Sequence, residues 1–110
     1  MYEYGAGVTE DEAEVGKWYR LAADQGDATG QTNLGGMYEY GEGVPEDKAE
    51  AVKWYRLAAE QGDASGQANL GTMYDYGEGV SEDNAEAVKW YRLAAEQGNA
   101  SGQANLGTMY

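Results

Sequence analysis

The stretch WYRLAAEQG occupies residues 54–62 and again residues 90–98, and WYRLAADQG occupies residues 18–26. Successive copies are 36 residues apart, and the flanking residues keep the same spacing, with methionines at 1, 37, 73 and 109. A fixed period of about 20–50 residues is typical of repeat proteins, in which each unit packs on its neighbours. The chain is therefore expected to be an array of repeats.

Residues 48–61 are expected to form one helix of the repeat. The pattern Asp47-x-x-Glu50 resembles a capping box, in which the Asp side chain accepts hydrogen bonds from free backbone N–H groups, and Gly62 favours a helix end. On a helical wheel the apolar residues cover well over half of the circle, with Trp54 inside the arc and Leu57 on its flank. A face this wide contacts two neighbouring layers, so the equivalent tryptophans are expected to be buried.

Residues 64–76 are expected to form the other helix, with Asp63 as its N-cap. Glycines recur inside this helix at positions 30, 66 and 102, and at 35, 71 and 107. A glycine inside a helix costs about 1 kcal/mol relative to alanine, so its recurrence needs a physical reason. Close approach of neighbouring helix backbones provides that reason.

The sequence therefore predicts an all-α fold, an α/α superhelical solenoid of antiparallel helix pairs with a 36-residue repeat, as one array over residues 1–110. Residues 1–26 are a partial repeat with only its second helix, residues 27–62 and 63–98 are full repeats, and residues 99–110 are the first helix of another. Residues 1–4 are expected to be the tail of a first helix. A glycine turn at residues 5–8 and a capping box at Asp11 and Glu14 follow by analogy with the later copies.

Composition excludes several classes of function. Twenty acidic residues against seven basic ones give a net charge of −13, which argues against nucleic acid and anionic membranes as partners. No apolar run approaches the roughly 20 residues that a membrane span requires, so membrane insertion is not expected. The chain has no Cys and no His, and no serine stands near a general base at a telling spacing. We therefore expect no catalytic residues, no metal site and no cofactor, and the sequence assigns no cellular compartment.

Four motifs together resemble the Sel-one-like repeat family, a relative of the tetratricopeptide repeats. They are Asn-Leu-Gly-x-Met-Tyr, Gly-x-Gly-Val-x-x-Asp, Ala-x-x-Trp-Tyr-x-x-Ala-Ala and Gln-Gly, and they keep their mutual spacing along the whole chain. The resemblance implies an α/α solenoid that serves as a protein–protein scaffold, commonly in bacteria. It also implies that the first helix of each repeat lines a concave side, where the Asn before Leu-Gly often holds the ligand backbone.

On this reading, the partner is a protein or peptide segment held on the concave face. The expected contact residues are Asn33, Glu39, Tyr40, Asn69, Thr72, Asp75, Tyr76 and Asn105. The first helices contain no Lys or Arg, so a basic or neutral segment is favoured over one with an acidic C-terminus. The alternative role for the three asparagines is to cap or bridge neighbouring helices.

A second hypothesis is structural self-assembly. The array starts on a second helix and stops on a first helix, so a second copy of the chain could continue the register head to tail. Such a contact is heterologous and does not close on itself, which would produce columns or filaments.

The wheel generates a stability prediction. Trp54→Ala is expected to lower the free energy of unfolding by roughly 3–5 kcal/mol, because it removes a large side chain from the core. Urea denaturation followed by circular dichroism measures this loss. A loss below about 1 kcal/mol would mean that the wrong face of the helix had been taken as buried.

Overall fold

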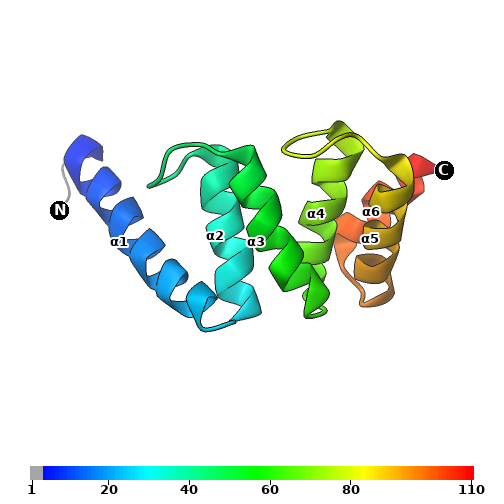
Figure 1. Cartoon of the computed structure of the whole chain (residues 1–110), viewed down its shortest axis with the longest axis horizontal. Helices are drawn as coiled ribbons and strands as arrows, with labels where there is room; N and C mark the ends of the chain where they lie inside the picture. Colours follow the sequence, from blue (N-terminus) through cyan, green and yellow to red (C-terminus); the bar gives the residue numbers. More distant parts are fainter. Residues whose placement is uncertain (1–3) are drawn as a thin grey trace.

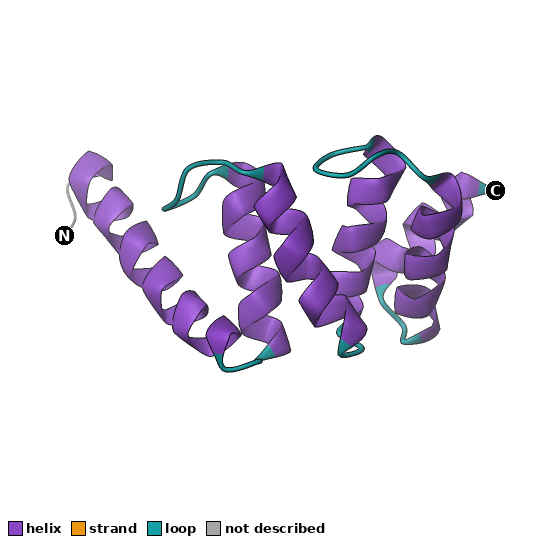
Figure 2. Cartoon of the chain, viewed as in Figure 1, coloured by secondary structure: helices purple, strands orange, loops and turns teal. Residues whose placement is uncertain are grey.

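The computed structural model describes the backbone of residues 4–110 and the side chains of residues 11–110. These residues form six α-helices: α1 (Tyr4–Asp24), α2 (Ala28–Tyr40), α3 (Lys48–Glu60), α4 (Ala64–Tyr76), α5 (Asn84–Glu96) and α6 (Ala100–Met109). They follow one another along the long axis of the molecule, with the longer loops at one edge and the tight turns at the opposite edge (Figure 1). The described residues contain helices and loops without strands (Figure 2), and none of these helices is long and apolar enough to cross a membrane. The predicted all-α solenoid is confirmed.

The capping residues lie at the helix starts that the sequence indicated. The Asp63 carboxylate accepts a hydrogen bond from the Gly66 backbone N–H at 2.8 Å, and the Asp47 carboxylate accepts one from Glu50 N–H at 3.1 Å. In a full capping box the Glu50 side chain would also accept a hydrogen bond from the Asp47 backbone N–H. Here that N–H donates to the Tyr38 carbonyl instead, at 2.8 Å. This backbone bond ties the start of α3 to the helix before it.

The start of the chain differs from the prediction. Residues 1–3 of the predicted helix tail lie outside the described residues, and α1 runs without a break through the predicted turn at residues 5–8 and the predicted cap at Asp11. In the later repeats this turn rests on an earlier helix: a Cβ added to Gly43 would lie 2.8 Å from the Glu12 carbonyl oxygen. Among the described residues no earlier helix supports a turn at residues 5–8, and helical hydrogen bonds form there instead.

The core is built both within repeats and between them. Trp54 is 5% exposed and packs with Ala23 and Leu34 of the preceding helices. Trp90 is 7% exposed and belongs to the equivalent cluster one repeat later. The expectation of burial is wrong for Trp18, which is 58% exposed. Among the described side chains, no counterpart of Ala23 and Leu34 packs on the Trp18 indole.

The outer edge of the second helices is also more exposed than the wheel indicated. Leu57 was expected in the apolar arc but is 39% exposed, like Leu93. Helix α3 packs on α2 and α4, so the side turned away from both neighbours stays in solvent. Leu57 lies at that boundary.

The recurring glycines bring the helices close together, as expected. A Cβ added to Gly35 would lie 2.7 Å from the ring of Tyr55, and one added to Gly71 would lie 2.7 Å from the ring of Tyr91. Distances below 3.0 Å are not sterically tolerated, so each tyrosine ring requires a glycine beneath it. The equivalent Gly107 has nothing within 4 Å of an added Cβ.

This difference gives a matched pair of variants. Gly71→Ala is expected to destabilise the fold by about 1–3 kcal/mol, because the overpacked ring of Tyr91 outweighs the gain of about 1 kcal/mol in helix propensity. Gly107→Ala is expected to be neutral or slightly stabilising. Urea midpoints for the two variants measure the contrast, and equal shifts would show that the glycines serve some purpose other than ring packing.

Candidate peptide-binding groove

The first helices of the repeats, α2, α4 and α6, form one face of the array. Helix α2 contacts α4, and α4 contacts α6. Each of these helices also packs on the second helices next to it in the chain. Among the described residues, the second helices α1, α3 and α5 make no contacts of this extent with one another. The inner layer of a curved array is the more closely packed one, so this packing supports the expectation that the first helices line a concave side.

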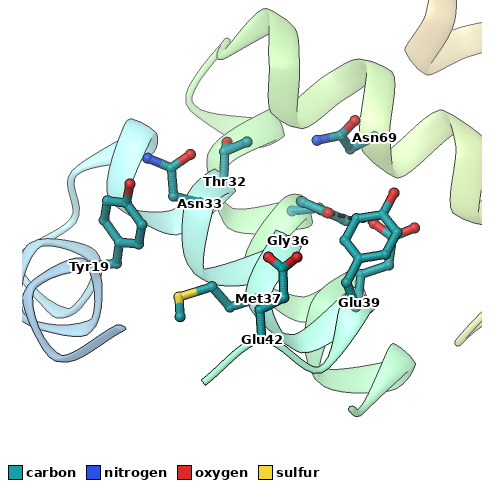
Figure 3. Close-up of a pocket in the computed structure, with 10 residues that line it drawn as sticks. Tyr19, Thr32, Asn33, Gly36, Met37, Glu39, Glu42 and Asn69 are labelled. Carbon is teal, nitrogen blue, oxygen red and sulfur yellow. Dashed lines mark hydrogen bonds between the residues drawn. The ribbon is translucent and has the colours of Figure 1, made fainter. Parts of the chain in front are cut away.

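A pocket of about 360 Å³ opens on this face between α1, α2 and α4. Figure 3 shows Asn33 beside Tyr19 on one side, Asn69 on the other, and the carboxylate of Glu42 directed into the space below them. The complete lining is Tyr19, Thr32, Asn33, Gly36, Met37, Glu39, Tyr40, Glu42, Tyr55 and Asn69.

The structure divides the eight residues expected from the sequence into two groups. Four of them line the pocket: Asn33, Glu39, Tyr40 and Asn69. The other four lie further along the array and do not line it: Thr72, Asp75 and Tyr76 on α4, and Asn105 on α6. Tyr40 and Tyr76 are the most exposed of the eight, at 67% and 70%.

The three asparagines have free amide groups. Asn33, Asn69 and Asn105 are half-buried, and within the part of the chain whose side chains are described no protein group hydrogen-bonds to their amides. The alternative role considered for these asparagines was to bridge neighbouring helices. Glutamines form such bridges here: Gln61 donates to Gln31 at 2.8 Å, and Gln97 donates to Gln67 at 2.9 Å.

The two acidic residues of the first helices, Glu39 and Asp75, serve the packing of the repeats. The Tyr55 hydroxyl donates to the Glu39 carboxylate at 2.6 Å, and the Tyr91 hydroxyl donates to Asp75 at 3.0 Å. Burial, and then the adjacent Glu39 carboxylate, raise the pKa of Tyr55. Burial is also the main cause that raises the pKa of Tyr91 to about 12. Both hydroxyls therefore remain protonated donors at neutral pH.

The ammonium group of Lys48, 5.9 Å from the centre of the Tyr40 ring, has partners of its own. Lys48 forms an ion pair with Glu46 at 3.2 Å and donates to the backbone carbonyl of Glu39 at 3.0 Å. Its hydrogen bond to Glu46 is the main cause that raises the pKa of Lys48, so the ammonium group stays charged. No lysine or arginine is among the residues that line the pocket.

Sequence reasoning missed Tyr19, Thr32, Gly36, Met37, Glu42 and Tyr55 as pocket residues. Tyr19 and Tyr55 belong to second helices, and only the packed array shows that their side chains reach the first-helix face. Gly36 carried a readable signal, because the equivalent residues of the later repeats are Thr72 and Thr108.

The chain is similar to three solved structures of bacterial repeat proteins. One is a protective antigen present in uropathogenic Escherichia coli and described as displaying an SLR fold, with 52% identity, a TM-score of 0.86 and coverage of 89% of this chain and 21% of that chain. A Sel1 repeat protein from Oxalobacter formigenes has 44% identity, a TM-score of 0.80 and coverage of 86% and 39%. The Helicobacter pylori cysteine rich protein B has 27% identity, a TM-score of 0.77 and coverage of 83% and 68%.

This chain thus spans about a fifth and about two fifths of the lengths of the first two proteins. No curated protein matches it. The family model of the Sel1 repeat matches residues 1–27, 28–63 and 64–99. Sel1 repeats are generally non-catalytic scaffolds for protein interaction. Since these matches cover almost the whole chain, the protein belongs to the Sel1 repeat family.

Proposed function

We propose that this chain is a non-catalytic interaction module that binds an extended peptide or protein segment, basic or neutral, along the groove formed by α2, α4 and α6. The observation that carries the proposal is the pocket on this face, which is flanked by Asn33 and Asn69, whose amides bond to no protein group among the described residues. An asparagine amide offers both a donor and an acceptor, as a peptide backbone requires.

The spacing of the asparagines suits an extended segment. Neighbouring helix layers are about 9–10 Å apart, and an extended chain advances about 3.3 Å per residue. Successive asparagines on α2, α4 and α6 are therefore matched by every third residue of such a segment. The absence of a cation in the sequence of these helices, together with the net charge of −13, disfavours an acidic segment.

The groove is tested with three decapeptides that share a glycine–serine framework and carry lysine, glutamine or glutamate at every third position. We expect the lysine and glutamine peptides to bind more tightly than the glutamate peptide in isothermal titration calorimetry. The double variant Asn33→Ala/Asn69→Ala is expected to weaken binding about tenfold, because each lost hydrogen bond is worth about 0.5–1.5 kcal/mol.

The control is Glu60→Ala/Glu96→Ala, which removes two exposed carboxylates from the second helices. If overall negative charge alone attracts the lysine peptide, this control loses more affinity than the asparagine variant, and the groove is not the binding site. Unchanged binding in the asparagine variant would also overturn the proposal.

A second candidate function is head-to-tail self-association, and the two end faces of the array favour it. Trp18 of α1 is 58% exposed. The equivalent residues of α3 and α5, Trp54 and Trp90, are buried against the helices that precede them. Helix α6 presents Gly107, which has open space where Gly35 and Gly71 receive a tyrosine ring. The α1 face of one copy therefore carries the side chains that the α6 face of another would receive.

Sedimentation velocity at rising concentration tests this second candidate. We expect the average mass of the wild-type chain to increase with concentration, and Gly107→Ala to suppress the increase by obstructing the incoming ring without destabilising the monomer. The exposed Leu93→Ala provides a control at the same end of the chain. A mass that stays monomeric up to millimolar concentration, or an increase that Gly107→Ala leaves unchanged, would eliminate self-association.

A further inference from the structure

One substitution between repeats opens the pocket. Position 36 is glycine in α2, whereas the equivalent residues of α4 and α6 are Thr72 and Thr108. In α4 the threonine occupies the space above the tyrosine, since the Tyr91 hydroxyl donates to Thr72 Oγ1 at 3.3 Å. In α2 position 36 has no side chain, and the Tyr55 hydroxyl lies 3.7 Å from where a Cβ would stand. Tyr55 is among the residues that line the pocket.

The pocket contains a buried carboxylate that forms no direct ion pair with a described lysine or arginine. Glu39 is 8% exposed and lines the pocket, and one of its oxygens accepts from the Tyr55 hydroxyl at 2.6 Å. Lys48 acts on it electrostatically, but the Lys48 ammonium pairs with Glu46. Buried carboxylates are normally paired with a positive charge, because removing the charge from water is costly. Direct pairing with Glu39 is therefore left to a cation from outside the chain.

The remaining lining suits a planar cation. Glu42 places a second carboxylate at the rim, as Figure 3 shows, and Tyr19 and Tyr40 add aromatic rings to the walls. A guanidinium group can pair with carboxylates through several N–H groups and can stack on aromatic faces, which an ammonium group does less well. A volume of about 360 Å³ is near the lower end of ligand pockets, about 300–1,000 Å³, and fits one long side chain better than a larger ligand.

We propose that this pocket, called here the Gly36 pocket, receives one arginine side chain of the segment bound in the groove, with its guanidinium group between the carboxylates of Glu39 and Glu42. The inference rests on the proposed groove and adds a specific side chain to it. Because Thr72 fills the equivalent place in α4, the arginine is accepted at one position of the segment only, and this fixes the register of the segment along the array.

The test uses two decapeptides with the same glycine–serine framework and a single central residue, arginine in one and citrulline in the other. Citrulline has almost the same shape but no charge. We expect the wild-type chain to bind the arginine peptide about tenfold more tightly, as a charge-assisted hydrogen bond requires. We expect this preference to shrink as salt is added, because exposed parts of the pair are screened.

Gly36→Thr closes the pocket with the residue that the later repeats carry. A Cβ at Gly36 lies 3.7 Å from the Tyr55 hydroxyl, which is ordinary contact, so the variant is expected to fold. Its affinity for the arginine peptide should fall to that for the citrulline peptide. Glu42→Gln should reduce the preference severalfold, while Glu78→Gln, the same change one repeat later, should leave it unchanged.

The outcomes separate the two proposals. If the wild-type chain binds the citrulline peptide as tightly as the arginine peptide, or if the preference survives in Gly36→Thr, the arginine pocket is overturned and the groove remains. If neither peptide binds the wild-type chain, while circular dichroism shows it to be folded, both the groove and the pocket are overturned.

Discussion

The packing of a tyrosine ring on a helical glycine is the contact on which the rest of this structure depends. The ring of Tyr55 lies so close to Gly35 that even a methyl group there would collide with it, and Tyr91 repeats the contact on Gly71. The glycines cost helix propensity, but they allow the second helix of each repeat to approach the first helix closely enough to bury a whole aromatic side chain. Tyr55 and Tyr91 are accordingly among the most deeply buried large residues, at 1% and 0% exposed.

The same tyrosines connect the core to the concave face. The ring of Tyr55 lies in the core, whereas its hydroxyl holds the Glu39 carboxylate and forms part of the pocket wall. The hydrogen bond keeps Glu39 in a fixed orientation on the surface where we propose that a ligand binds. The packing that stabilises the array thus also positions a residue of the proposed groove.

Small differences between nearly identical repeats then create distinct environments along the groove. Where α2 has Thr32, the hydroxyl donates to the Asp63 carboxylate of the next turn at 2.8 Å, whereas α4 has Ala68 and lacks this bond. Where α2 has Gly36, Tyr55 lines the pocket. Where α4 has Thr72, the threonine hydroxyl accepts a hydrogen bond from Tyr91 of α5. A repeat array can therefore keep its backbone contacts constant and vary its surface one position at a time.

The sequence by itself determined the helices, because the helix caps, the glycine stops and the 36-residue period are local signals that repeat in every copy. It also indicated the face that carries Asn33 and Asn69, since these residues follow the periodicity of the first helices. Only the tertiary structure decided features that depend on a neighbouring repeat. Among the described residues no earlier helix packs on α1, which is continuous and leaves Trp18 exposed. The pocket takes Tyr19, Glu42 and Tyr55 from three separate segments. Burial in a solenoid is a property of the contact between units, so a pattern read within one unit determines its helices but not what covers them.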